Sequence, residues 1–133
     1  MNYSYESYLS QPHVIPVEKM QEIHNLLLSE IDSDEDAQDF YKDLLNVSVR
    51  YADIRSNWNF LNVDDKLEKD SSRTSCHDSV ITHINMLARY LKSKGKSAKW
   101  RDELGYIEDD IYNRKIIGDF ACYLSFICAV NAR

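Results

Sequence analysis

The stretch that decides the fold is Tyr106–Arg133, which reads YIEDDIYNRKIIGDFACYLSFICAVNAR. After Lys115, its apolar residues cover every side of a helix in two stripes at helical spacing. A helix that is apolar all round is normally buried among other helices. The sequence therefore predicts that the C-terminal helix is the centre of a helical bundle. The two stripes are Ile116, Phe120, Tyr123, Ile127 and Val130, and then Ile117, Ala121, Leu124 and Cys128.

Two long helices are expected in the first half of the chain. Pro16 suits the first turn of a helix that ends near Ile31, because its fixed φ matches a helix start. Ser33 is expected to cap a second helix, which runs to about Leu61 and carries a heptad seam typical of shallow helix packing. The core-facing residues are Met20, Ile23, Leu27 and Ile31 on the first helix, and Phe40, Leu44, Val47, Tyr51, Ile54, Trp58 and Leu61 on the second.

The segment 62–75 is polar and has no apolar stripe, so it is predicted to be a loop or a loosely held helical extension. A third main helix, capped by Ser75, is expected to end near Gly95, and Ser97 to cap a short helix closed by Gly105. The predicted fold class is all-α: a bundle of four main helices plus a short fifth, with a central apolar C-terminal helix. The core-facing residues of the third helix are Cys76, Val80, Ile84, Leu87 and Leu91.

Length and composition fit one helical domain over residues 1–133, with residues 1–15 as an N-terminal arm. The chain has only three Gly and two Pro, which favours long helices. Its three Cys are expected to be reduced thiols, and its N-terminus lacks the pattern of a secretory signal. The apolar C-terminal run is too short to span a bilayer. These features predict an acidic cytoplasmic protein that does not enter a membrane.

The net charge of -6 argues against broad nucleic-acid binding, but charge is unevenly distributed along the sequence. Seven acids lie between Glu30 and Asp43, and six bases with no acid lie between Arg89 and Arg101. The basic stretch could hold phosphate and stack a base. The interpretation that we favour is a solvated turn with Trp100 packed inward. The candidate binding residues are Lys92, Lys94, Lys96, Lys99, Trp100 and Arg101.

Neither a metal ion nor another cofactor is expected. Four acids match ligand positions of a calcium-loop template, but Ala37 stands where that loop needs Gly, so we interpret them as an acidic helix N-terminus. Cys76 and His83 share a helix face, and His24 could join them around a metal. Histidines hydrogen-bonded in or beside the core are the preferred interpretation. The four acids are Asp32, Asp34, Asp36 and Asp43.

Two short patterns resemble enzyme motifs. Arg73 and His77 resemble the arginine–histidine pair of the HEPN helical ribonucleases, whose pair flanks a dimer cleft and acts on RNA phosphate; here only three residues separate the two.

The stretch GDFACYL resembles the end of the acidic magnesium motif of MazG-type nucleotide pyrophosphohydrolases, with Asp119 as its last carboxylate. Ile116 replaces the Glu of that motif, so no magnesium-dependent activity is predicted. Inside so apolar a helix, Asp119 needs either a partner such as Arg or His from a facing helix or an exposed crevice.

The sequence leaves two classes of function open. The first is a small acidic helical interaction or regulatory protein without catalytic activity, which acts through protein–protein contacts. The alternative is a HEPN-like, metal-independent ribonuclease or another nucleotide-acting helical enzyme that uses Arg73, His77 or Asp119. A protein partner of unknown identity is expected, and nucleic acid is not favoured.

A homodimer through the C-terminal helix is also expected, because apolar residues persist almost to the chain end. They include Phe126, Ile127 and Cys128, on different sides of the helix. In the competing interpretation the protein is a monomer, and an arm carrying Tyr3, Tyr5 and Tyr8 covers this surface.

Overall fold

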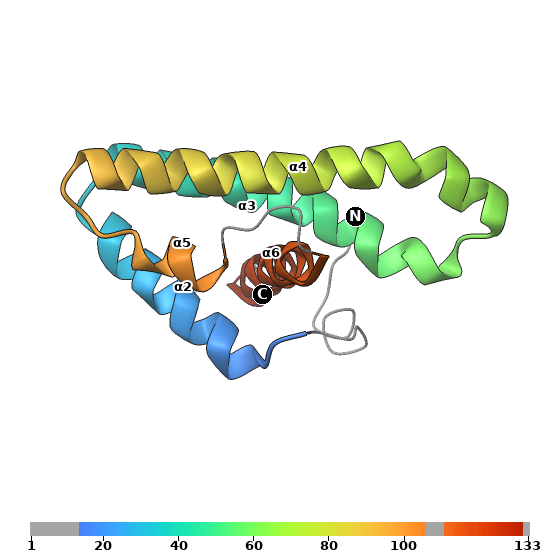
Figure 1. Ribbon diagram of the computed structural model, residues 1–133, viewed down its shortest axis with the longest axis horizontal. Helices are drawn as coiled ribbons and strands as arrows, with labels where there is room; N and C mark the ends of the chain where they lie inside the picture. The colour runs from blue at the N-terminus through green and yellow to red at the C-terminus, as the bar shows by residue number, and fades with distance from the viewer. Residues whose placement is uncertain (1–13, 106–110, 132–133) are drawn as a thin grey trace.

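The computed structural model describes residues 14–105 and 111–131, and the regular structure within these ranges is entirely helical (Figure 1). Four long helices and one short α-helix form a bundle, which confirms the predicted fold class. The elements are α2 (Val17–Ile31), α3 (Glu35–Asn57), the 3-10 turn η1 (Trp58–Phe60), α4 (Val63–Ser93), α5 (Lys99–Glu103) and α6 (Ile111–Asn131).

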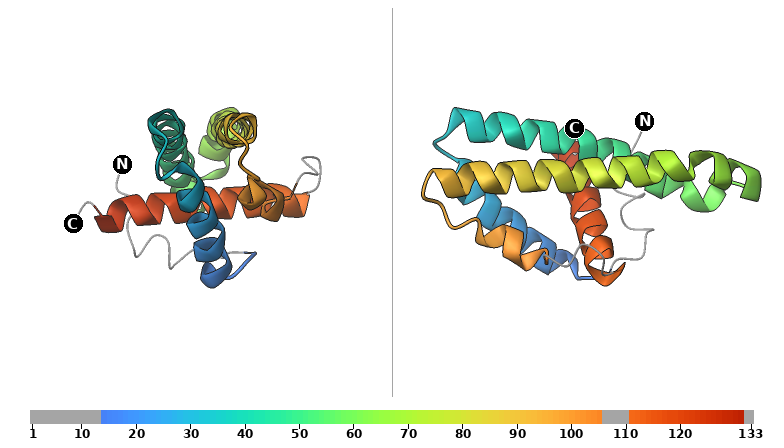
Figure 2. Two further views of the ribbon diagram at one scale, coloured as in Figure 1. Left: turned by 90° about the vertical axis from the view of Figure 1, so that its left-hand side faces the viewer. Right: turned by 45° about the horizontal axis from the view of Figure 1, so that its top comes forward.

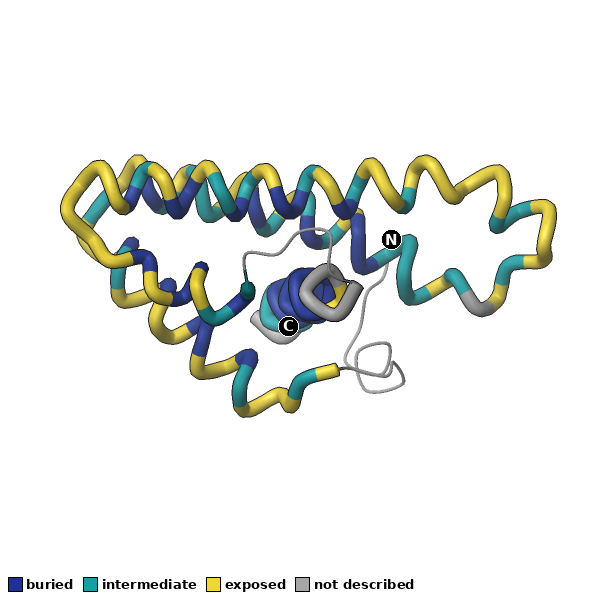
Figure 3. Tube along the Cα trace, viewed as in Figure 1, coloured by how far each residue is buried: buried dark blue, intermediate teal, exposed yellow. Residues whose placement is uncertain are grey.

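The C-terminal helix α6 lies at the centre of the bundle, as predicted. Helices α3 and α4 form a long antiparallel hairpin, and α6 crosses beneath it with α2 on its other side (Figures 1 and 2). Every described residue from Ile116 to Ser125 is buried, including Phe120 and Leu124, which are fully buried (Figure 3). The all-round apolar pattern of α6 is thus explained by helices that cover it on opposite sides.

Helix α2 buries the face that its periodicity predicts. Met20, Ile23, Leu27 and Ile31 are all buried in the common core. Pro16 stands one position before the helix, as its N-cap, rather than inside the first turn. Its carbonyl still accepts the first bonds of the helix, from the amides of Lys19 and Met20.

The predicted cap of α3 was wrong by one residue. Asp34, not Ser33, is the N-cap, and its carboxylate accepts a hydrogen bond of 3.1 Å from the amide of Ala37. An Asp cap also places negative charge at the positive end of the helix dipole. The same geometry excludes a calcium loop here, because the residues after Asp34 are helical.

Helix α4 begins far earlier than a start at Ser75 would require. Asn62 is the N-cap and accepts a 2.8 Å hydrogen bond from Asp65, so the polar segment 63–75 is the first part of one helix of 31 residues. Of the two predictions for this segment, the helical extension is confirmed and the loop is wrong. The polar side chains of this segment give it no apolar stripe, but they do not prevent a helix, since Asp, Lys and Glu are compatible with a first turn.

The C-terminal end of α4 is formed as predicted. Gly95 has φ +82°, and the amides of Gly95 and Lys96 donate to the carbonyls of Lys92 and Leu91, the two bonds of a Schellman motif. The short helix α5 then begins after Ala98, which is its N-cap in place of the predicted Ser97 and has a left-handed backbone (φ 49°). Gly105, at φ +81°, follows the helix as predicted.

Candidate functional site

The buried carboxylate of Asp119 joins three parts of the chain. Asp119 is 0% exposed, and its Oδ1 accepts a 2.6 Å hydrogen bond from Nη2 of Arg55 on α3. Its Oδ2 accepts a 2.6 Å bond from the amide of Val14, just before α2. Burial works against the charged form of Arg55, but nearby Cys122, Tyr51 and Asp119 outweigh it and raise the pKa of the guanidinium. The prediction that Asp119 pairs with an Arg of a facing helix is confirmed.

Gly118 allows α6 to approach α3 at this point. A Cβ atom on Gly118 would lie 2.7 Å from the hydroxyl oxygen of Tyr51 and 3.0 Å from Nη1 of Arg55. Both distances are shorter than ordinary van der Waals contacts. Because Gly118 has no side chain, the ends of Tyr51 and Arg55 can occupy the space beside Asp119.

Tyr51 connects the three residues that the enzymatic interpretation names. The ring of His77 on α4 packs edge-on against Tyr51 with centroids 5.2 Å apart. Burial raises the pKa of Tyr51, and the positive charges of Arg55 and Arg73 partly offset that effect. Arg55 in turn binds Asp119. The alternative catalytic set is thus linked to Tyr51 by the His77 ring contact, by Arg55 for Asp119, and by the charge of Arg73. We call these five residues the Tyr51 cluster.

The accessible edge of this Tyr51 cluster is formed by Arg73. Its guanidinium carbon lies 4.4 Å from the centroid of the Trp58 ring, a cation–π contact between α4 and η1. His77 itself is only 7% exposed. An RNA phosphate could therefore meet Arg73 directly, whereas proton transfer by His77 would need the side chains over it to move.

Sequence reasoning assigned no role in a site to Tyr51, Arg55 or Trp58. Tyr51 and Trp58 were identified only as members of the core seam of α3. Arg55 follows Ile54, another member of that seam, so its position beside a core-facing residue was the available signal. A cation at the margin of the buried face of α3 is the kind of partner that Asp119 required.

The acidic and basic stretches that are far apart in sequence meet at one end of the hairpin. Because α3 and α4 are antiparallel, the start of α3 lies beside the end of α4 (Figure 1). The Tyr90 hydroxyl donates to Asp34, 2.9 Å and 2.8 Å from its two carboxylate oxygens. The Ala37 amide, the Tyr90 hydroxyl and the charge of Lys94 lower the pKa of Asp34. The asymmetry along the sequence is therefore partly neutralised in space.

Glu30 holds the basic stretch against α2. Its Oε1 accepts a 2.9 Å hydrogen bond from the indole Nε1 of Trp100, and its Oε2 accepts from the Ala98 amide at 3.1 Å and the Ser97 hydroxyl at 3.2 Å. Trp100 is 0% exposed. Glu30 thus fixes Ala98, the left-handed residue before α5, and accepts the hydrogen bond of the buried Trp100 indole. This agrees with the predicted inward packing of Trp100.

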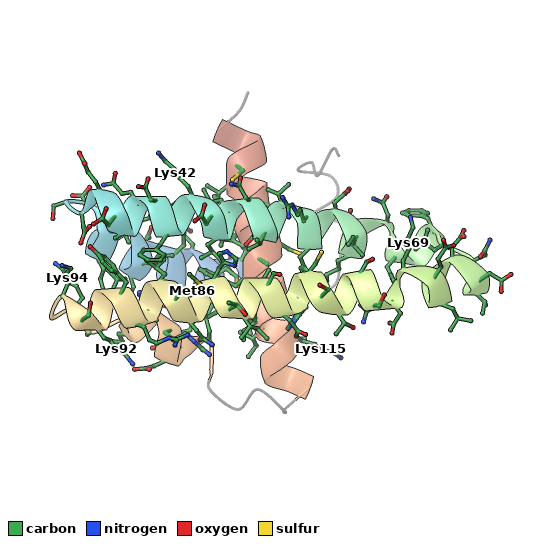
Figure 4. All side chains as sticks on the ribbon, turned by 90° about the horizontal axis from the view of Figure 1, so that it is seen from above. Lys42, Lys69, Met86, Lys92, Lys94 and Lys115 are labelled. Atoms are coloured by element: carbon green, nitrogen blue, oxygen red, sulfur yellow. The ribbon has the colours of Figure 1, made fainter. Side chains whose placement is uncertain are left out.

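Of the six candidate binding residues, the structure separates two from the others. Arg101 is 2% exposed, with Nε 2.8 Å from Oδ1 of Asn85, so it lies in the interior with Trp100 and offers no surface for a ligand. The four lysines are exposed, and Figure 4 shows Lys92 and Lys94 at the same end of the hairpin. Binding of nucleic acid by these lysines stays a prediction, without a stacking Trp100. The four are Lys92, Lys94, Lys96 and Lys99.

The histidines proposed as possible metal ligands make separate hydrogen bonds. Nε2 of His24 lies 2.7 Å from the Tyr41 hydroxyl, and Nδ1 of His83 donates to the carbonyl of Ser79 at 2.8 Å. Within residues 14–105 and 111–131, no group of three His, Cys, Asp or Glu side chains could hold a metal ion. In the same ranges no helix has both the length and the apolar content to cross a membrane.

Burial of His24 predicts that the protein loses stability in mild acid. His24 is 5% exposed, and burial lowers its pKa below the ordinary value of a histidine. A histidine whose pKa is lower in the folded state contributes its full stability above the unfolded pKa and loses it as pH falls below that value. We expect the urea midpoint to decrease between about pH 7.5 and about pH 5.

The neutral variant His24→Gln isolates this contribution, since Gln can still bond the Tyr41 hydroxyl. The stability of the wild type relative to this variant should fall on acidification. A difference that stays constant across the pH range would contradict the assignment.

The far end of the α3–α4 hairpin carries the most exposed apolar side chains of the described chain. Phe60 is 85% exposed, and Val63 and Leu67 are each 73% exposed, whereas the other exposed large apolar side chains reach at most 42%. Figures 1 and 3 show this end projecting past α6, with mostly exposed residues. We call Phe60, Val63 and Leu67 the tip stripe. Sequence reasoning missed it, because it assigned this segment no apolar stripe.

Comparison with known proteins gives no match: no family model, no curated protein and no solved structure is significantly similar to the chain.

Proposed function

We propose that this protein is a small acidic helical interaction protein of the cytoplasm, which acts by binding a protein partner and not by catalysis. The observation that carries the proposal is the tip stripe. Large apolar side chains at 73–85% exposure, grouped at the end of a projecting hairpin, are a pattern typical of protein-binding surfaces. Burial of such side chains by a partner would supply binding free energy that the isolated chain cannot gain.

Use of the polar groups inside the bundle also supports this proposal. Asp119 and Arg55 bind each other between α6 and α3, and Glu30 joins α2 to the start of α5. These contacts connect helices that are far apart in sequence, so the buried charges can be explained by their role in the stability of the bundle. No such role in stability explains the exposed apolar side chains of the projecting tip.

Site-specific photo-crosslinking in cells of the native host tests the proposal. A crosslinker in place of Leu67 should give a product with a defined protein, and the same group in place of Lys42 should not. Lys42 is also exposed but lies on α3 toward the opposite end of the hairpin (Figure 4). Equal products from both positions, or none from position 67, would contradict an interaction surface at the tip.

The second candidate is a HEPN-like, metal-independent ribonuclease, and the Tyr51 cluster is the observation that favours it. Arg73 could hold an RNA phosphate while His77 moves a proton. Incubation of the pure protein with RNA in the presence of a chelator tests this activity. His77→Ala should abolish turnover, while the matched variant His83→Ala, half-buried on the same helix, should retain it. Turnover with this dependence would replace the interaction proposal.

A further inference from the structure

The tip stripe belongs to a part of the hairpin that no other described helix covers. Val63 and Leu67 are four residues apart on α4 and so share one face of the helix, and Phe60 lies in the turn just before it. Helix α6 crosses the hairpin nearer its middle, and α2 and α5 lie toward its opposite end (Figures 1 and 2). Two helices alone cannot enclose an apolar face, whereas four can.

We propose that the tip stripe is the contact surface for a second copy of this chain, so that two hairpin ends pair antiparallel into a four-helix arrangement. The inference rests on the proposed function, because it names the occupant of the same surface. A two-fold contact is isologous: one patch meets its own copy, so a single apolar stripe per chain is sufficient.

The size of the stripe fits such a contact. An aromatic side chain offers about 150–250 Å² of surface, and at the exposures above the three side chains together offer on the order of 400 Å² per copy. Two copies would bring on the order of 800 Å² of apolar surface together. A standard stable interface buries about 1,600 Å², of which somewhat more than half is apolar. The two stripes would thus supply most of the apolar area of such an interface.

Charge along this part of α4 permits self-contact. The segment 63–73 carries four acids and three bases, so it is nearly neutral in a chain of net charge -6. Val63 and Leu67 are four residues apart on α4. When two identical helices pair antiparallel about a two-fold axis, the numbers of facing residues have a constant sum, so a stripe centred between these two residues places Val63 of one copy opposite Leu67 of the second copy. The stripe itself therefore defines one register.

The mass of the full-length protein in solution, measured by light scattering over a wide concentration range, tests the inference. The wild type should be a dimer, and Leu67→Asp should raise the dimer dissociation constant at least about 100-fold, since both copies lose an apolar anchor. The matched variant Leu28→Asp, which alters a 38% exposed Leu of α2, should stay dimeric. Circular dichroism checks that both variants are folded.

A wild type that is monomeric at every concentration, or a Leu67→Asp variant that dimerises as the wild type does, would overturn the inference. If a monomeric wild type still crosslinks to a different protein from position 67, the second copy is refuted while the proposed function stands. If a monomeric wild type gives no crosslinked product from position 67, both the second copy and the proposed function are refuted.

Discussion

Leu124→Asp is expected to unfold the protein. Leu124 is a 0% exposed residue of α6, and α6 lies with the α3–α4 hairpin on one side and α2 on the other (Figure 2). An aspartate there would place a charge among apolar side chains, and loss of the leucine would remove buried apolar area. We expect a loss of at least about 4 kcal/mol of unfolding free energy, comparable to the whole stability of a small domain.

Thermal and urea unfolding followed by circular dichroism measure this effect. The matched control is Lys115→Asp, which introduces the same residue at an exposed position of the same helix (Figure 4) and should change stability by no more than about 0.5 kcal/mol. An unchanged melting temperature for Leu124→Asp would contradict the central position of α6.

Asp119→Ala is the second variant with a large expected effect. The change removes the carboxylate that binds the Val14 amide and the mostly buried guanidinium of Arg55. Breaking one side of a buried pair costs about 3–5 kcal/mol. We therefore expect a large decrease in the urea midpoint with little change in the slope of the unfolding curve.

A double-mutant cycle shows whether the loss comes from the pair itself. The single variants of the cycle are Arg55→Met and Asp119→Leu, and their combination leaves apolar side chains in place of both charges. The double variant should be clearly more stable than Asp119→Leu alone, because neither charge is then buried without the other. A double variant that is less stable by the sum of the single losses would refute the coupling.

Much of the fold follows from local patterns in the sequence. The periodicity of α2 identified its buried face, and the two stripes of α6 identified the central helix, because an all-apolar helix has no stable position at a surface. Gly95 marked the end of α4, since a left-handed C-terminal residue favours glycine. The failures were at helix starts. Asp34 replaced Ser33 as a cap because Asp and Ser are similarly favoured at the N-cap. Helix α4 extended back to Val63 because Lys and Glu continue a helix without any apolar stripe.

The candidate site could be predicted only in part for a similar reason. Sequence alone showed that Asp119 needs a cation, since the cost of a buried charge is independent of the fold. It could not show that Arg55 supplies it, nor that Arg73, His77 and Asp119 are linked to Tyr51, because these residues come from three helices whose contacts depend on packing. The tip stripe was hidden likewise, since Phe60, Val63 and Leu67 differ from core residues only in lacking a neighbour.

The sequence by itself determined the main helices, except where α4 begins, and that α6 is buried, because both depend on hydrogen bonding and apolar periodicity within one segment. Only the tertiary structure decided which charges meet. The antiparallel hairpin brings Asp34 to Tyr90 and Lys94, and Glu30 closes on Trp100, so a sequence with separated acids and bases forms one mixed end. Such pairings depend on distances through space, and distances across helices are set by packing and not by position in the chain.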